Sequence, residues 1–372
     1  MIVGVPTEIK THEYRVALTP AAARELVEHG HQVLMQSGAG EGSGHHDGDY
    51  TAQGARIVPT AGDVFDEAEL VVKVKEPQPA EVAMLSPGQL LFTYLHLAAD
   101  KDLTVSLRDS GAIGIAYETV ELPDHSLPLL APMSEIAGRM ATQVGAYFLE
   151  KAEGGRGILL GGIPGVMPAK VVVVGAGMAG TNAAVIAMGM QARVVALDRD
   201  ADKLRQLDSL YLGHIVTLSS NRLTLEEQVV DADLVVGAAL IPGASAPKLV
   251  TEDMIRSMRP GSVVVDISID QGGCFETSRP TSHADPVYEM HGVVHYAVTN
   301  IPGAVPQTST YGLTNATLPY VLQLADHGLE EAVQMNGAMR SGINVARGVV
   351  VHPAVAESLD LEYGTVSEVL GF

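Results

Sequence analysis

Cysteine is almost missing from this chain. Its 372 residues include a single cysteine, Cys274, so no disulfide can form within the chain. Structural disulfides belong to oxidising compartments, whereas a lone thiol fits a reducing one. We therefore expect a cytoplasmic protein.

Long apolar runs and a leader segment are missing as well. A membrane-spanning helix needs about 20 consecutive apolar residues, and the Val-rich runs here are short and end in Gly or Asp. Residues 1–6 lack the basic start, long apolar stretch and small-residue cleavage site of a signal peptide. We expect neither secretion nor membrane association.

Basic residues are scarce. Lys and Arg number 23 against 44 Asp and Glu, which gives a formal net charge of -21, and such a surface repels nucleic-acid phosphates and anionic lipid headgroups. Nucleic acid is therefore not an expected partner. A small anionic substrate would need a local cationic patch, so Arg and Lys in apolar settings become informative.

Short apolar runs that predict strands alternate with helical segments. In the first part of the chain these runs are 2–6, 32–36, 70–74, 90–95 and 113–117, and a helix begins at Thr19-Pro20 and stops at Gly30. In the second part they are 171–174, 193–197, 215–218, 234–238, 262–267 and 293–298. Val-rich strands of this kind are typical of parallel sheets buried on both faces, and six of them suit a doubly wound dinucleotide-binding domain.

This alternation, in a chain longer than one core usually serves, predicts an α/β fold of two domains. Each domain is expected to be Rossmann-like with a mainly parallel sheet, and a substrate cleft is expected to separate them. A helix at about 134–151 would link them, and the tail from about 307 is predicted to be helical, with helices at 318–327 and 329–336. Because such a tail commonly packs back on the first domain, we predict a discontinuous substrate domain, 1–126 and 307–372, around a nucleotide-binding domain at 127–306.

The strongest local motif is a buried strand that runs into G-x-G-x-x-G and then a helix-prone stretch. Gly175 permits the tight turn, Gly177 lets the backbone approach a pyrophosphate, and Gly180 lets helix and strand pack closely. The pyrophosphate would lie at the helix N-terminus, where free amide groups favour negative charge. A glycine triplet alone is weak evidence, because glycines also serve ordinary turns.

Asp198 strengthens the interpretation of the glycine triplet as a nucleotide-binding motif. It ends the second strand, 21 residues after Gly177, where a carboxylate would accept hydrogen bonds from the adenosine ribose hydroxyls. It would also repel a 2′-phosphate, which favours NAD over NADP, although the adjacent Arg199 points the other way. The alternative is a solvated acid at a strand end.

Bound nicotinamide implies hydride transfer beside the carboxyl ends of the strands. Asp270 lies just beyond such a strand, and its alternative role is a turn-forming Asp before glycines. His96 ends an apolar strand, and imidazole suits proton exchange near neutral pH. A lone His there is more often structural, and the chain holds 13 histidines.

Two cationic residues near strand ends are the remaining candidate site residues. Arg15 follows a polar loop, and Lys75 ends a strand before Glu76-Pro77. A guanidinium can clamp a carboxylate and an ammonium can polarise a carbonyl. Either residue could equally be a solvated surface charge.

Together these segments resemble the alanine dehydrogenase family over essentially the whole chain. The matching motifs are Gly4 to Lys10, Arg15 to Pro20, Lys73 to Pro77, the glycine motif, Val265 to Cys274, Thr308 to Tyr311 and Leu313 to Thr317. The resemblance implies reversible oxidative deamination of L-alanine to pyruvate and ammonia with NAD. It also implies that Arg15 and Lys75 bind substrate, that His96 and Asp270 are catalytic, and that the assembly is a homohexamer.

The resemblance further implies a set of cofactor contacts. They are Ser134, Gly175, Gly177, Met178, Ala179, Gly180, Asp198, Lys203, Ser220, Ala239, Leu240, Ile267, Ser268, Ile269, Asp270, Val298, Thr299, Asn300 and Ile301. No metal site is predicted.

The expected chemistry begins with hydride transfer from Cα of alanine to nicotinamide. Water then attacks the resulting iminopyruvate, and the carbinolamine loses ammonia, with His96 and Asp270 as the acid/base groups. The nearest alternative is the NAD-binding, hydride-carrying component of proton-translocating transhydrogenase, which lacks its own acid/base pair. An NAD-sensing or scaffold protein without turnover is a non-enzymatic alternative, and saccharopine dehydrogenase shares the architecture but takes larger substrates.

Overall fold

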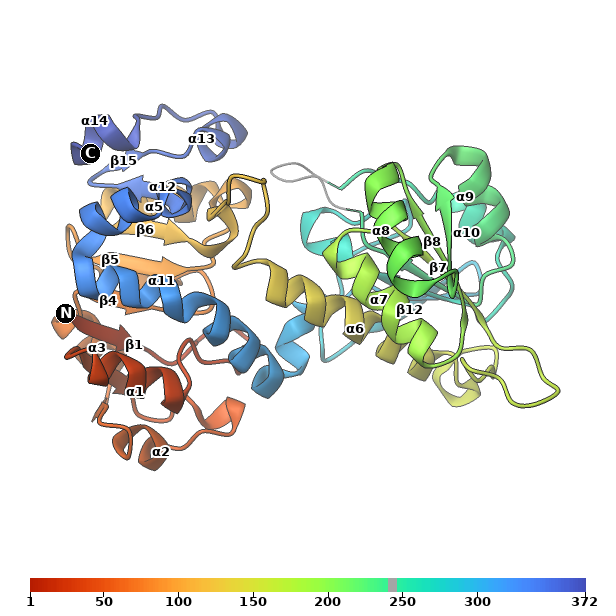
Figure 1. Cartoon of the computed structure of the whole chain (residues 1–372), viewed down its shortest axis with the longest axis horizontal. Coiled ribbons are helices and arrows are strands. Elements are labelled where there is room, and N and C mark those ends of the chain that lie inside the picture. Colours follow the sequence, from red (N-terminus) through yellow and green to blue (C-terminus); the bar gives the residue numbers. More distant parts are fainter. Residues whose placement is uncertain (240–245) are drawn as a thin grey trace. The chain divides into compact units, whose positions relative to one another are not determined.

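The computed structural model describes residues 1–239 and 246–372 (Figure 1). The chain forms two compact units, Met1–Met133 with Val305–Phe372, and Ser134–Ala304. Unit 1 is therefore built from both ends of the chain and unit 2 from its middle. These bounds differ by a few residues from the domain boundaries that we predicted.

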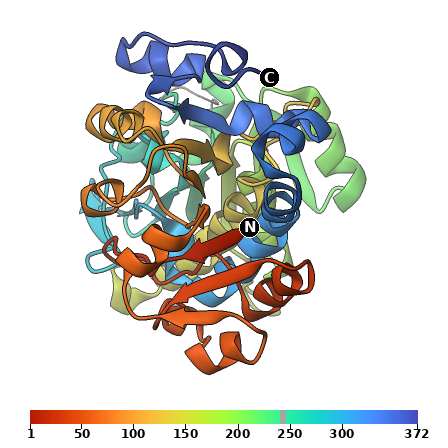
Figure 2. The same ribbon diagram turned by 90° about the vertical axis from the view of Figure 1, so that its left-hand side faces the viewer.

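Unit 1 contains an eight-stranded sheet in the order β15-β14-β6-β5-β4-β1-β2-β3. Strands β1 to β6 pair in parallel, whereas β14 and β15 join antiparallel at one edge. Figure 2 shows the C-terminal segments at that edge and the strands of the first sixty residues toward the other. The strands are β1 (Ile2–Val5), β2 (Gln32–Gln36), β3 (Arg56–Val58), β4 (Leu70–Val72), β5 (Leu90–Thr93), β6 (Ile113–Ala116), β14 (Ile343–Ala346) and β15 (Val349–Val350).

Helices fill the connections of unit 1. As predicted, the first begins after Thr19, whose side chain accepts a hydrogen bond from the amide of Ala22, and Pro20 occupies its first turn. The α-helices are α1 (Pro20–Glu28), α2 (Asp47–Thr51), α3 (Ala61–Glu67), α4 (Pro79–Val82), α5 (Lys101–Asp109), α11 (Pro306–Met335), α12 (Gly337–Gly342), α13 (Pro353–Leu359) and α14 (Val366–Leu370), and the 3-10 helices are η1 (Glu41–Ser43), η2 (Leu97–Ala99) and η3 (Tyr117–Thr119).

Unit 2 contains a seven-stranded sheet in the order β12-β13-β11-β10-β7-β8-β9. All neighbours pair in parallel except β12, which is antiparallel to β13. The strands are β7 (Lys170–Val174), β8 (Arg193–Asp198), β9 (Ile215–Ser219), β10 (Leu234–Gly237), β11 (Val263–Asp266), β12 (Val287–Met290) and β13 (Val293–Tyr296). The predicted α/β fold with two mainly parallel sheets is confirmed.

The helices of unit 2 lie between its strands or flank them in sequence. They are α7 (Met178–Gly189), α8 (Ala201–Tyr211), α9 (Arg222–Val229), α10 (Glu252–Ser257), and the 3-10 helices η4 (Lys151–Glu153), η5 (Ile267–Gln271) and η6 (Ile301–Ala304). Helix α6 (Ala131–Phe148) is the predicted linking helix, and it begins three residues earlier than predicted. Among the described residues, no helix is both long and apolar enough to cross a membrane.

The central strands are buried on both faces. Val172, Val235 and Val264 of three neighbouring strands share one apolar cluster with Phe275 and Met254, and Val71, Leu91 and Leu107 share another in unit 1. Burial on both faces explains why these strands are continuous Val and Leu runs without alternation.

The C-terminal tail was predicted to be helical only, but it contains strands as well as helices. Helix α11 begins at Pro306, and Gly328 interrupts it with a φ of 72°, but the chain then returns as β14 and β15, which extend the sheet of unit 1. The short strands β3 and β12 were also not predicted. Strands of two to four residues carry too little periodicity to be recognised without their partners.

Candidate active site

Three candidate residues of unit 1 follow three neighbouring parallel strands. Arg15 lies in the connection after β1, Lys75 follows β4, and His96 follows β5. Because β1, β4 and β5 are adjacent and parallel, their carboxyl ends meet at the same edge of the sheet. Sheet order therefore gathers residues that are far apart in sequence, at the edge where α/β folds bind ligands.

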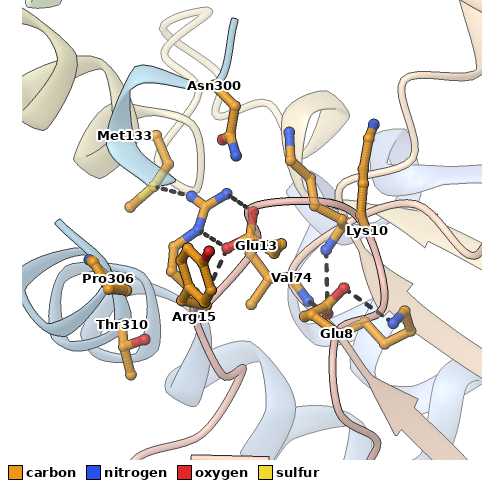
Figure 3. Close-up of polar contacts among 12 residues, drawn as sticks. Glu8, Lys10, Glu13, Arg15, Val74, Met133, Asn300, Pro306 and Thr310 are labelled. Atoms are coloured by element: carbon orange, nitrogen blue, oxygen red, sulfur yellow. Dashed lines mark hydrogen bonds and ion pairs between the residues drawn. The ribbon is translucent and has the colours of Figure 1, made fainter. Parts of the chain in front are cut away.

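Arg15 is buried, with only 2% of its side chain exposed. Its Nε donates to Glu13 Oε1 at 2.6 Å, its Nη2 donates to Glu13 Oε2 at 2.5 Å, and its Nη1 contacts Met133 Sδ at 3.0 Å (Figure 3). Burial opposes the charged form, but Glu13 outweighs it and raises the pKa of Arg15. The guanidinium is thus a permanently charged group held in one orientation.

Helix α11 anchors the loop that carries Arg15. The amide of Val16 donates to Thr310 Oγ1 at 3.1 Å, and the hydroxyl of Thr314 donates to the carbonyl of Ala17 at 3.0 Å. Ser43 Oγ lies 2.8 Å from Thr310 Oγ1 and completes the contact. The return of the C-terminal segment to unit 1 therefore fixes the backbone beside Arg15.

Lys75 follows a buried charge cluster. Lys73 Nζ donates to Glu8 Oε2 at 3.1 Å and to Glu81 Oε1 at 2.6 Å, and all three side chains are at most 3% exposed. Glu8 Oε1 in turn accepts from the amide of Val74 at 2.6 Å (Figure 3) and from the amide of Lys75 at 3.4 Å. Burial raises the pKa of Glu8 despite the attraction of Lys73. The cluster fixes the backbone from which the Lys75 side chain projects.

His96 occupies a strained turn between β5 and η2. Its φ is 50°, in the left-handed region that non-glycine residues rarely adopt. Glu118 accepts hydrogen bonds from the amides of Leu95 at 3.2 Å and His96 at 2.6 Å, and Tyr94 stacks on the imidazole with ring planes 5° apart. The side chain is 47% exposed, so the imidazole is accessible as well as supported.

The glycine motif of unit 2 has the geometry of a phosphate-binding turn. Gly175 has a φ of 102°, and a Cβ at Gly180 would lie 1.8 Å from the carbonyl oxygen of Gly175, so neither position accepts a side chain. A Cβ at Gly177 would meet nothing within 4 Å. Helix α7 starts there without a side-chain cap. Its first amides and the open space beside Gly177 fit a pyrophosphate.

Asp198 lies beside this turn, at the end of β8. Its Oδ2 accepts from the amide of Ala176 at 2.7 Å and its Oδ1 from the amide of Asp200 at 2.9 Å. The amide of Ser220 donates to the carbonyl of Asp198 at 2.8 Å. The structure therefore brings Asp198 and Ser220 together with the glycine motif, whereas the exposed Lys203 pairs with Asp200 at 3.9 Å.

Asp270 and Asn300 meet at the ends of β11 and β13. Asp270 is exposed in η5, and its Oδ2 accepts from the amide of Asn300 at 3.4 Å. The buried Asp266 shapes this turn by accepting from Cys274 N at 3.0 Å and from Ser278 Oγ at 2.5 Å. Burial nevertheless raises the pKa of Asp266.

The other predicted cofactor contacts lie after strands of unit 2 or in its helices. Ser268 Oγ donates to the carbonyl of Ala239 at 2.7 Å, which joins the ends of β10 and β11. Leu240 lies outside the described residues. The remaining positions are Met178 and Ala179 at the start of α7, Ile267 and Ile269 in η5, Val298, Thr299 and Ile301 after β13, and Ser134 in α6.

The sequence matches known families along nearly all its length. The model described as "Alanine dehydrogenase/PNT, N-terminal domain" matches residues 4–137, and "Alanine dehydrogenase/PNT, C-terminal domain" matches residues 141–353. The chain belongs to the alanine dehydrogenase/PNT family. The resemblance inferred from the motifs is confirmed.

The similar proteins include alanine dehydrogenases and a transhydrogenase, which represent two branches of the family. A protein of Halomonas elongata named alanine dehydrogenase is 56% identical over 371 residues, covering 100% of both chains. A solved structure of L-alanine dehydrogenase matches with a TM-score of 0.94 and 52% identity over 97% of this chain and 99% of that one. A transhydrogenase structure from Sinorhizobium meliloti matches with a TM-score of 0.81 at 27% identity over 95% and 100%. The chain is thus more similar to the alanine dehydrogenases.

Several residues that support this family's site were missed from the sequence. Glu13 and Asp266 accept hydrogen bonds from residues two positions further along the chain, whereas Glu118 reaches His96 across neighbouring strands. Asp266 and Glu8 did lie inside the motifs quoted for the resemblance, but nothing in those motifs assigned them a role. Glu118 follows β6 without any local signal.

Proposed function

We propose that this chain is an NAD-dependent L-alanine dehydrogenase, which interconverts L-alanine with pyruvate and ammonia. The observation that carries the proposal is the 56% identity, over complete chains, to a protein named alanine dehydrogenase. The candidate residues Arg15, Lys75, His96 and Asp270 support it, because each follows the carboxyl end of a parallel strand. We further propose a cytoplasmic homohexamer, as the family resemblance implies.

Unit 2 is the proposed NAD-binding unit. When bound, NAD supplies the hydride acceptor for alanine oxidation or the donor for the reverse reaction. The amides at the start of α7 would bind the pyrophosphate, beside the open position at Gly177. Asp198 would bind the adenosine ribose and disfavour the additional phosphate of NADP.

Unit 1 is the proposed substrate unit. Arg15 would bind the substrate carboxylate, because the guanidinium is permanently charged and oriented by Glu13. Lys75 would stabilise negative charge on the carbonyl oxygen of pyruvate and on the developing carbinolamine. The buried cluster of Glu8, Lys73 and Glu81 would preserve the position of Lys75 by holding its backbone.

His96 and Asp270 are the proposed acid/base groups. An amino group must lose a proton before Cα can be oxidised, and water must lose one as it adds to the imine carbon. We assign the principal proton transfers to the imidazole of His96, which is accessible and stacked on Tyr94. Asp270 would orient the amino group and the water, since its carboxylate is exposed at a strand end.

The test is NADH formation by the purified chain with L-alanine and NAD, beside His96→Ala and with glycine and serine as further substrates. We expect turnover with alanine that collapses in His96→Ala. NAD binding without any turnover by the wild type would contradict the proposal and favour a hydride carrier like transhydrogenase.

A further inference from the structure

Glu118 forms a bridge between two backbone amides and the candidate catalytic imidazole. It lies in η3, directly after β6, and only 16% of its side chain is exposed. Its carboxylate accepts from the amides of Leu95 and His96, and Oε1 also lies 3.9 Å from His96 Nδ1. Strand β6 pairs in parallel with β5, so register alone brings Glu118 beside the turn that ends β5.

The bridge explains how His96 keeps a left-handed backbone. A non-glycine residue with a φ of 50° is strained unless surrounding contacts hold it there. The 2.6 Å hydrogen bond from its amide to Glu118 supplies such a contact. The ring of Tyr94 stacks on one face of the His96 imidazole and restricts its rotation. The Tyr94 hydroxyl donates a 2.6 Å hydrogen bond to the carbonyl of Leu129, which fixes the position of the Tyr94 ring.

We propose that the charge of Glu118 makes it a positioning residue for His96, which orients the imidazole with Nδ1 toward the carboxylate and Nε2 toward the substrate. This inference rests on the proposed function. A carboxylate beside Nδ1 favours the tautomer with a proton on that nitrogen, which leaves Nε2 as the base.

One other titratable side chain, His352, interacts with the same carboxylate. Helix α13 packs against η2, and His352 is the residue directly before α13. The Nδ1 atom of His352 is buried and has no hydrogen-bond partner among the described residues. Burial lowers the pKa of His352, while Glu118 and Glu121 oppose that effect. Glu121 itself pairs with His125. The neutral form of His352 that burial favours leaves the charge of Glu118 available to His96.

The decisive variant is Glu118→Gln, because the amide oxygen can still accept from both backbone amides while the charge is lost. Acid/base groups contribute about a hundredfold to ten-thousandfold to rates, so loss of this alignment should lower kcat by about tenfold or more. The KM for alanine and the affinity for NADH should stay within about twofold, since Arg15 and the glycine motif are untouched. Glu118→Asp, which keeps the charge but moves it back by one methylene, should have an intermediate kcat.

Glu121→Gln is the matched control, because Glu121 is a neighbouring carboxylate that pairs with His125. It should leave kcat unchanged. A Glu118→Gln enzyme with the kcat of wild type, or with a kcat at or above that of Glu118→Asp, would overturn the proposal. Glu118 would then only hold the backbone in place.

Thermal melting shows whether Glu118→Gln folds. If it does not fold, Glu118→Asp decides: a lowered kcat at unchanged KM supports the proposal, and a wild-type kcat overturns it. Every comparison is made with wild-type turnover on alanine, so absence of that turnover would instead contradict the proposed function.

Discussion

At the scale of single residues, the candidate site consists of the residues proposed to act on substrate and of the neighbouring residues that hold them in place by hydrogen bonds. Arg15 is held by Glu13, the Lys75 backbone by Glu8, and His96 by Glu118. Each of these holders is a carboxylate, and a hydrogen bond to an ionised acceptor is stronger than one between neutral groups.

Arg15→Lys tests the geometry of the guanidinium separately from its charge. Lysine keeps the positive charge but cannot make the paired Nε and Nη2 contacts to Glu13. We expect kcat/KM for alanine to fall by about tenfold to a hundredfold, mainly through KM, as loss of a charged hydrogen bond predicts. Steady-state kinetics check this, with Arg24→Lys on the exposed face of α1 as the control. An unchanged KM in Arg15→Lys would remove Arg15 from substrate binding.

The candidate residues could be selected from the sequence only because several motifs resembled one family. Taken alone, His96 was one of 13 histidines and Arg15 an ordinary cation in a polar loop. Glu118 could not be selected, because its role depends on the register of β6 beside β5. Such a partner lies 22 positions away in the chain, and no local pattern records it.

At the scale of elements, the candidate residues follow the carboxyl ends of the strands, and helix α11 holds the loop that carries one of them. Helix α11 donates no side chain to the proposed reaction, yet Thr310 and Thr314 bind the backbone on the C-terminal side of Arg15. The predicted strands were recovered because each is a continuous apolar run bounded by turn or helix signals. By contrast, β14 and β15 were missed because β14 joins the sheet through β6, which is distant in sequence, and β15 joins it only through β14.

Thr310→Val should loosen the Arg15 loop without altering the site residues themselves. The substitution leaves the amide of Val16 without its acceptor and the hydroxyl of Ser43 without this partner, at a cost of about 1–3 kcal/mol in unfolding free energy. KM for alanine should rise while NADH affinity stays the same. Thr317→Val is the control, since the Thr317 hydroxyl bonds to carbonyls of its own helix. Equal effects of the two variants on KM would contradict the anchoring role.

The sheet of unit 2 should make stability depend on pH through His295. This side chain is buried on β13, with Nε2 2.9 Å from Thr277 Oγ1 and Nδ1 2.9 Å from the carbonyl of Val293. Burial lowers its pKa from 6.5. The unfolded chain therefore takes up the proton first, so the stabilisation is present above pH 6.5 and is lost as pH falls through the lowered value.

His295→Gln should remove this contribution. We expect the unfolding free energy of wild type, measured with urea, to fall more steeply than that of the variant between about pH 7 and pH 5. His214→Gln, at an exposed position, should keep the wild-type slope. Parallel slopes for wild type and His295→Gln would show that His295 is not the titrating group.

At the scale of the whole molecule, the two units differ in how the chain builds them. Unit 2 is a continuous segment, Ser134–Ala304, whereas unit 1 combines Met1–Met133 with Val305–Phe372. A continuous segment with its own sheet and core has the properties of an independently folding domain.

We therefore expect residues 134–304 alone to fold and to enhance NADH fluorescence, without turnover of alanine. The Gly177→Ala form of this fragment is the control. A Cβ at that position meets nothing within 4 Å, so folding should be unaffected, but the methyl group would enter the proposed pyrophosphate position. Circular dichroism and NADH titration check both fragments. Equal NADH affinities would argue against cofactor binding at the glycine motif.

The discontinuity of unit 1 also sets an order of events during protein synthesis. A ribosome delivers residues in sequence, so the proposed nucleotide-binding unit can be complete while the other sheet still lacks β14 and β15. The loop that carries Arg15 is synthesised before that unit, but its threonine anchors emerge only with α11. A nascent chain halted before Pro306 would therefore carry a finished unit 2 and an unanchored Arg15 loop. Under the proposed function, the capacity to recognise substrate would be acquired only once α11 has been synthesised.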